Sequence, residues 1–257
     1  MAKKVLLVAP NYGGWGEEQQ APWDILREAG FEVTMATPRG KKPLPFAVSV
    51  DPEFVDPIQD YHTNPPEVCE RVKELVDGTE WENCIKIDDA KMSDYDAIAL
   101  TCGPGAILDP NGRKHLHDML LEAYRDNKVI GALCYSVAAL VFTRDPENDY
   151  KSILYGKNVT AHPRAWDFHF DLDHSDLYGI TPDNQPTNLV TPGFIYPLQD
   201  LATDAVGPEG SVAFADNANR ENPSVVYDHP FITGCSVESS IAYGEKIVEV
   251  LKKKKEA

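Results

Sequence analysis

Short apolar runs alternate with helical stripes of apolar residues along most of the chain. The runs that predict buried strands are 4–9, 31–37, 95–101 and 129–133. Between them, apolar residues recur at the i, i+3, i+4 spacing of helices, in the stretches 17–29, 68–76 and 116–124. Strands that alternate with helices are typical of a parallel sheet with helices on its faces, so the pattern predicts an α/β fold.

Two stretches interrupt this rhythm and predict insertions near residues 40–92 and 164–221 of a single domain that spans 1–257. The first begins with a proline-rich segment, and the second is rich in Asp, Pro and Asn with strand-like runs only at 188–191 and 210–214. A strand at 157–161 precedes the second insertion. A hairpin at 224–227 and 231–233 follows it, and the final helix then opens after Gly234, with Ile241 on its expected apolar face.

Cys134 stands where the apolar run 129–133 gives way to a helical stretch that begins at Tyr135. Ala132 and Ser136, two positions to either side, are small, as a strained strand–nucleophile–helix turn requires. A thiol at the start of a helix is also placed where the helix dipole favours thiolate. The pattern therefore predicts a nucleophile elbow, with a buried structural cysteine as the alternative.

Four predicted loops follow the carboxyl ends of strands, where ligands bind in open parallel sheets. They follow Ala9, Thr101, the strand before Cys134, and Ala161, and they carry Glu17 and Glu18, Gly103, Cys134, and His162. If these loops converge, a nucleophilic thiol, a carboxyl group and an imidazole lie together. At this point either Glu17 or Glu18 can supply the carboxyl group.

The charge balance excludes several kinds of partner. Lys and Arg number 24 against 41 Asp and Glu, for a net charge of −17, whereas a nucleic-acid or anionic-membrane surface needs clustered basic residues. No stretch approaches the roughly 20 apolar residues of a membrane span. The five cysteines are odd in number and lack C-x-x-C spacing, so neither a disulfide framework nor a zinc site is indicated, and we expect a cytoplasmic protein.

A cluster of acidic residues and histidines in the second insertion raises a metal site as a hypothesis. Its members are His169, Asp171, Asp173, His174 and Asp176. The spacing fits neither a calcium loop nor the H-E-x-x-H helix of zinc enzymes, so a solvated acidic loop is favoured. We therefore expect neither a metal nor another cofactor.

Five stretches together resemble the ThiJ/PfpI family, the Parkinsonism-associated deglycase superfamily with its class I glutamine-amidotransferase-like fold. They are Glu18 with Pro22, Asp24 and 29–33; 95–100 before a glycine turn; 132–134; 159–163; and 226–240. The resemblance implies a flavodoxin-like three-layer sandwich with a mostly parallel sheet. It also implies that Cys134 is the nucleophile, Glu18 a protonated general acid/base and His162 a proton carrier, with the backbone N–H groups of Gly103 and Tyr135 as the oxyanion pocket.

Three departures indicate a divergent subgroup. Many hydrolytic and glyoxalase members of the family have a histidine directly after the cysteine, whereas this chain has Tyr135. The usual Pro-Gly-Gly turn is replaced by Cys102-Gly103 followed by Pro104, and Ser136 stands where glycine is common. These differences argue against protease activity in particular.

The preferred function is a cysteine-dependent enzyme acting on a small carbonyl or amide-like substrate through Cys134. The single reaction preferred is glutathione-independent glyoxalase chemistry, methylglyoxal to lactate. The alternatives are an amidase or isonitrile-hydratase type of reaction and, from another class, a stress chaperone or a cysteine redox sensor. We further expect a homodimer.

Overall fold

The structure, a computed structural model, describes residues 2–107, 109–167 and 196–253. Its centre is a seven-stranded sheet with the strand order β14-β15-β9-β8-β1-β3-β7. The strands are β1 (Lys4–Val8), β3 (Glu32–Thr37), β7 (Ile85–Lys86), β8 (Ala97–Leu100), β9 (Val129–Leu133), β14 (Val225–Asp228) and β15 (Phe231–Gly234). Neighbouring strands run parallel except β14, which is antiparallel to β15.

Every residue of β8, β9 and β15 is buried, and so is β1 apart from its first residue. Continuous burial of this kind arises because helices cover both faces of a parallel sheet. The strands expected from the apolar runs are therefore confirmed, and so is the mostly parallel α/β fold.

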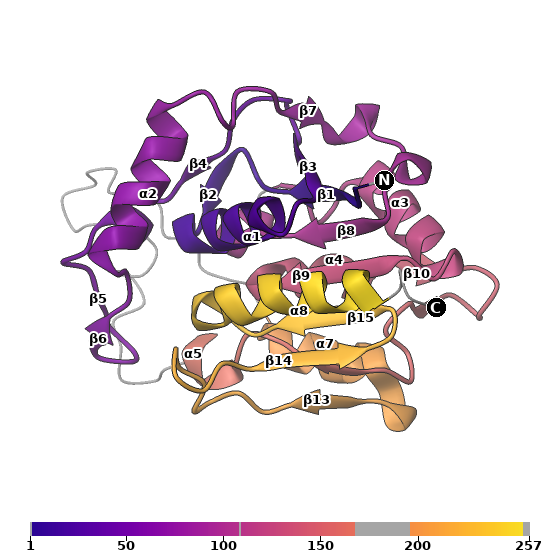
Figure 1. Ribbon diagram of the computed structural model, residues 1–257. Helices are drawn as coiled ribbons and strands as arrows, with labels where there is room; N and C mark the ends of the chain where they lie inside the picture. The colour runs from indigo at the N-terminus through magenta and orange to yellow at the C-terminus, as the bar shows by residue number, and fades with distance from the viewer. Residues whose placement is uncertain (1, 108, 168–195, 254–257) are drawn as a thin grey trace, which may run out of the picture.

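Helices α1 (Gly16–Glu28) and α8 (Ser240–Lys253) pack against each other on one face of the sheet, with α2 (Pro66–Asp77) beside α1. Helices α3 (Lys114–Arg125), α4 (Val137–Phe142) and α7 (Leu198–Val206) cover the other face (Figure 1). This is the three-layer arrangement expected. The predicted apolar face of the last helix is wrong in one respect, because Ile241 is half exposed and Tyr243 and Ile247 are buried instead.

Shorter elements lie outside the central sheet. They are the pairs β2 (Tyr12–Gly14) with β4 (Leu44–Pro45), β5 (Val55–Asp56) with β6 (Tyr61–His62), β10 (Arg144–Asp145) with β11 (Lys151–Ser152), and β12 (Asn158–Thr160) with β13 (Ser211–Ala213), and the short helix α5 (Arg164–Asp167). The strand expected at 157–161 thus forms, but it pairs with β13 instead of joining the central sheet. The carboxyl ends of the central parallel strands point toward β5, β6 and α5 (Figure 1).

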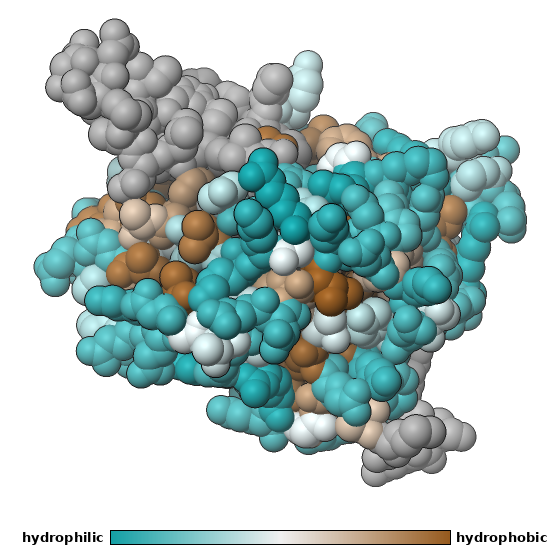
Figure 2. Space-filling view, turned by 90° about the horizontal axis from the view of Figure 1, so that it is seen from above, coloured by the Kyte–Doolittle hydropathy of each residue, from teal (hydrophilic) through white to brown (hydrophobic). Residues whose placement is uncertain are grey.

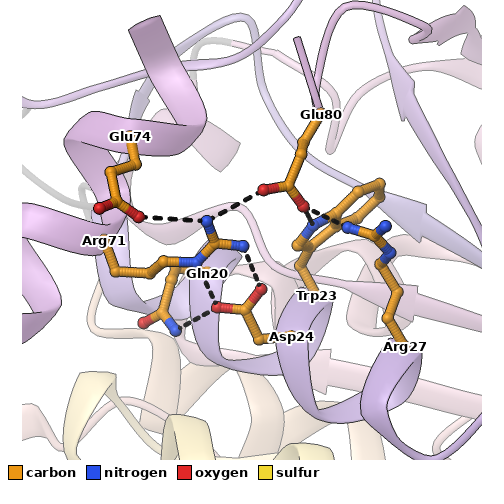
Figure 3. Close-up of polar contacts among 7 residues, drawn as sticks. All are labelled: Gln20, Trp23, Asp24, Arg27, Arg71, Glu74 and Glu80. Atoms are coloured by element: carbon orange, nitrogen blue, oxygen red, sulfur yellow. Dashed lines mark hydrogen bonds and ion pairs between the residues drawn. The ribbon is translucent and has the colours of Figure 1, made fainter. Parts of the chain in front are cut away.

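Helix α1 is fastened to α2 by a polar cluster around Arg71 (Figure 3). The Arg71 guanidinium donates to both carboxylate oxygens of Asp24, at 3.0 and 2.8 Å, and to Glu80 at 3.0 Å. Glu80 also accepts from Arg27. A bidentate arginine–carboxylate contact fixes both distance and orientation, so the cluster holds α1 in register with α2.

The face seen from above in Figure 2 is mainly hydrophilic, which agrees with the high content of acidic residues. Apolar side chains gather in smaller patches, some of them beside the grey atoms (Figure 2). In the described part of the chain, no helix has the length and apolar character needed to cross a membrane.

Candidate active site

The strand–turn–helix expected around Cys134 is present. Strand β9 ends at Leu133, a single 3-10 turn covers 134–136, and α4 follows. Cys134 adopts a φ of 55°, in the left-handed region that costs a non-glycine residue energy and that nucleophile elbows use to present a side chain. The Ser136 hydroxyl accepts the backbone N–H of Cys102 at 2.8 Å, which ties the elbow to the turn after β8.

Glu18 lies in the first turn of α1, and its side chain contacts the Cys134 thiol. The residue is 1% exposed. Burial, which disfavours the charged carboxylate, raises the pKa of Glu18 to about 8, although the contact with Cys134 acts in the opposite direction. Glu18 is therefore mostly a neutral acid at neutral pH.

The thiol of Cys134 is also held in its neutral form. Burial raises the pKa of Cys134 well above its usual value, and the adjacent Glu18 raises it further, while the backbone N–H of Tyr135 acts against both. The expectation that the helix dipole stabilises a thiolate is therefore wrong. The helix after the elbow is only six residues long, and desolvation outweighs it.

Gly103 is required where the turn after β8 meets the first turn of α1. Its φ is +52°, and a Cβ atom would stand 2.6 Å from the backbone nitrogen of Trp15 and 3.2 Å from Oε2 of Glu18. The backbone N–H of Gly103 lies against the Glu18 carboxyl, as that of Tyr135 lies against the Cys134 sulfur. Both N–H groups expected to form an oxyanion pocket are thus at the site, next to the thiol and the carboxyl.

His162 lies against the side chain of Tyr135, with the two rings stacked at 4.6 Å between centroids. The His162 side chain is 13% exposed, and its Nδ1 is 3.1 Å from Oδ1 of Asp167. Burial lowers the pKa of His162, but the charge and hydrogen bond of Asp167, together with the charges of Glu238 and Asp56, outweigh it, so the pKa is raised above its ordinary value. The loop histidine is therefore a buried, carboxylate-paired imidazole.

Asp167 connects two residues of the predicted site. Its Oδ1 accepts the phenol hydroxyl of Tyr135 and faces His162, and its Oδ2 accepts the backbone N–H of Leu198 at 3.3 Å. Burial raises the pKa of Tyr135 most, and the nearby charge of Asp167 raises it further, so the Tyr135 hydroxyl remains a neutral donor. Sequence reasoning missed Asp167, because its position after His162 belongs to no motif.

The model of the family described as ThiJ/PfpI family-like matches residues 9–164, which is more than half of the chain. The chain belongs to this ThiJ/PfpI-like family. The resemblance carried by the five sequence stretches is thereby confirmed. The matched range includes the Glu18 turn, Gly103, the Cys134 elbow and His162, and it ends just before Asp167.

Known proteins resemble this ThiJ/PfpI-like chain over nearly its whole length. The glutathione-independent glyoxalase hsp3101 of Schizosaccharomyces pombe is 26% identical over 267 residues, which cover 96% of this chain and 95% of that protein. The structure of the Rapid Encystment Protein 24 KDa of Francisella tularensis has a TM-score of 0.70 at 22% identity, covering 97% of this chain and 99% of that one. That of glyoxalase III from Candida albicans has a TM-score of 0.68 at 21% identity, covering 96% of both chains. The two structures support the same fold.

The other cysteines of the ThiJ/PfpI-like domain are packed away from solvent to different degrees. Cys102 and Cys235 are fully buried, Cys69 is nearly so, and Cys84 is half-buried. Within residues 2–107, 109–167 and 196–253, no group of His, Cys, Asp and Glu is arranged to hold a metal ion. The acidic cluster from His169 to Asp176 lies outside the described residues, as does the strand-like run 188–191.

Proposed function

We propose that this protein is a glutathione-independent glyoxalase that converts methylglyoxal to lactate on Cys134. The buried contact between the Cys134 thiol and the protonated Glu18 carboxyl carries the proposal. A neutral carboxylic acid can accept a proton on one oxygen while it donates one from the other. It can therefore assist the addition of a thiol to a carbonyl group without any change in its own charge. The names of two similar proteins, hsp3101 and glyoxalase III, support the same reaction.

In the first step the sulfur attacks the aldehyde carbon and an S–C bond forms. Glu18 accepts the thiol proton and donates its own proton to the aldehyde oxygen, which gives a neutral hemithioacetal. We assign to the backbone N–H groups of Gly103 and Tyr135 the stabilisation of the negative charge that develops on that oxygen. Because both groups are backbone donors fixed by the two turns, they need no rearrangement during the reaction.

In the second step the hemithioacetal is isomerised to a thioester. His162 has its Nδ1 beside Asp167, and we assign its other ring nitrogen to removing the proton from the former aldehyde carbon. Return of that proton to the neighbouring carbon, with proton exchange at the two oxygens, yields the thioester of lactate. No electrons enter or leave, because one carbon is oxidised as its neighbour is reduced.

In the third step water releases lactate. His162 accepts a proton from the attacking water, the C–S bond breaks, and Glu18 gives a proton to the departing sulfur. The lactic acid formed ionises to lactate, and the proton on His162 passes to Glu18, so both residues return to their starting states. Tyr135 replaces the histidine found after the cysteine in many relatives, so the proposal assigns base function to His162. Asp167 is the positioning residue, because its carboxylate favours the protonated imidazole formed in this step.

The test is lactate formation from methylglyoxal by the purified protein in the absence of glutathione. Cys134→Ala and Glu18→Gln should each reduce kcat/KM by about 10²-fold or more, the range of nucleophile and general acid–base losses. Cys84→Ala is the matched control, because that half-buried thiol contacts the carbonyl of Trp81 and should leave the rate unchanged. Absence of lactate, together with peroxide oxidation of Cys134 to sulfinate, would refute the proposal and favour a redox sensor.

A further inference from the structure

Glu17, the residue before the proposed acid, is bound by a single arginine. Its Oε1 and Oε2 accept from Nη1 and Nη2 of Arg220, both at 2.6 Å. The Glu17 side chain is 2% exposed and that of Arg220 is 29% exposed. A bidentate contact of this length with a buried carboxylate is among the stronger ion-pair geometries.

Arg220 also joins distant parts of the chain at this point. Its Nη2 donates to the backbone oxygen of Thr63 at 2.6 Å, and Thr63 is itself buried. Arg220 lies between β13 and β14, while Thr63 follows β6, so one guanidinium links its own segment to α1 and to the segment after β6. In the sequence, Arg220 is the only Lys or Arg between residues 165 and 245.

Among the described residues, several groups face Glu18 and Glu17. Glu18 faces the Cys134 thiol, the backbone N–H of Gly103, and the carboxylates of Glu17 and Glu238. Other titratable residues there that feel its charge are Cys102, Tyr135 and Tyr243, whose pKa values are raised so that they remain neutral.

Glu17 faces Arg220, Glu238 and Glu67. Glu238 is held in place from other directions, because it accepts the hydroxyl groups of Tyr61 and Ser236. Arg220 is thus the single cation among these groups.

We propose that Arg220 is a positioning residue of the candidate active site, which keeps Glu17 ionised so that the charge of Glu17 adds to burial in holding Glu18 in its acid form against Cys134. The bidentate contact with Arg220 is what keeps the buried Glu17 carboxylate ionised. Removal of one partner of a buried ion pair leaves the other uncompensated, and a buried carboxyl then binds a proton instead. Burial already raises the pKa of Glu17, and Arg220 is the group that lowers it.

A specific pattern follows for Glu17→Gln, Arg220→Gln and the double variant. Glu17→Gln removes a negative charge beside Glu18 and leaves the Arg220 cation, so the Glu18 titration should move to lower pH by about one unit. Arg220→Gln removes the cation and lets Glu17 take up a proton, so its shift should have the same direction but be smaller. The double variant should match Arg220→Gln, because Glu17 is already neutral there.

The measurement is the infrared absorption of the protonated Glu18 carboxyl against pH, identified by its absence in Glu18→Gln. The pH dependence of Cys134 alkylation by iodoacetamide is a second readout, because the thiol contacts that carboxyl. Neither measurement needs turnover. The proposal rests on the geometry of the proposed active site, and it can fail or succeed whether or not methylglyoxal is the substrate.

Arg71→Gln is the matched control, since Arg71 also binds an α1 carboxylate in a bidentate contact, that of Asp24 (Figure 3). This variant should lose stability without moving the Glu18 titration. An unchanged titration in Arg220→Gln would overturn the proposal, and so would a shift to higher pH, which would mean that Glu17 stays ionised without Arg220. Equal shifts in Arg71→Gln and Arg220→Gln would reduce the role of Arg220 to general stability.

Discussion

The buried acid Glu18 lowers the stability of the folded protein at neutral pH, so replacing it with glutamine should stabilise the fold. Its pKa is raised from 4.5 to about 8, mainly by burial. Between these values the folded state holds a proton that the unfolded state has released, and stability therefore falls as pH rises. At about 1.4 kcal/mol for each pKa unit, the cost is roughly 3 kcal/mol at pH 7 and about 5 kcal/mol above pH 8.

Glu18→Gln keeps the size and the acceptor oxygen of the side chain but cannot ionise. The difference in the free energy of unfolding between the variant and the original protein should be small near pH 5 and should widen in favour of the variant up to about pH 8.5. Urea denaturation across this range at fixed ionic strength measures that difference. The gain in stability should accompany loss of activity, as is common for strained active sites.

Glu249→Gln serves as the control with the opposite sign. Hydrogen bonds from Lys246 and Lys253 lower the pKa of Glu249 from 4.5 to about 2. The contribution of Glu249 to stability is therefore fully present above pH 4.5 and is lost only as pH falls from there through the folded-state pKa of about 2. The Glu249→Gln difference should therefore stay constant where the Glu18→Gln difference widens. A Glu18→Gln difference that is also constant, or that turns against the variant as pH rises, would refute the burial argument.

Three further predictions concern the surroundings of the thiol. Gly103→Ala should destabilise the fold by about 1–3 kcal/mol in urea denaturation, because its φ is +52° and a Cβ would meet the nitrogen of Trp15 at 2.6 Å; unchanged stability would contradict the close approach. Asp167→Asn should move the acidic limb of the pH profile of kcat/KM to lower pH, because Asp167 contributes most to raising the pKa of His162, the proposed base. An acidic limb that does not move would mean that His162 is not the group that titrates there. A 2-oxoaldehyde that carries a carboxylate, 4,5-dioxopentanoate, should be turned over at least about 10-fold less efficiently than its uncharged analogue 2-oxopentanal, since its negative charge would be repelled by Asp167 and Glu238, which face His162; equal kcat/KM values would contradict a repulsive site.

The sequence predicts the central strands and the elbow well because both have strong local signals. A parallel strand covered on both faces is a continuous apolar run, and β1, β8 and β9 have that form. Cys134 is marked by the change from strand to helix and by small neighbours. Glu18 and His162 follow from the rule that loops meet at the carboxyl ends of parallel strands.

The missed residues have no comparable local signal. Asp167 lies in a stretch crowded with aspartates, and only the three-dimensional contact with His162 and Tyr135 distinguishes it from the others. Arg220 is 203 positions from Glu17, so no spacing pattern connects them. A basic residue isolated in a long acidic stretch is the one clue that the sequence offers. The protonation state of Cys134 was predicted wrongly because burial, which decides it, is a tertiary property.

The pairing of β9 with β15 and the contact between Glu17 and Arg220 have a consequence for biosynthesis. Glu18 is synthesised first and Cys134 much later. The segments that complete their surroundings, Arg220 and β15, are synthesised after both. A nascent chain that stops before residue 220 contains the thiol and the acid but lacks Arg220 and the strand that flanks β9. Truncated copies of the protein should therefore carry the reactive residues without an assembled site, so that activity marks completed chains.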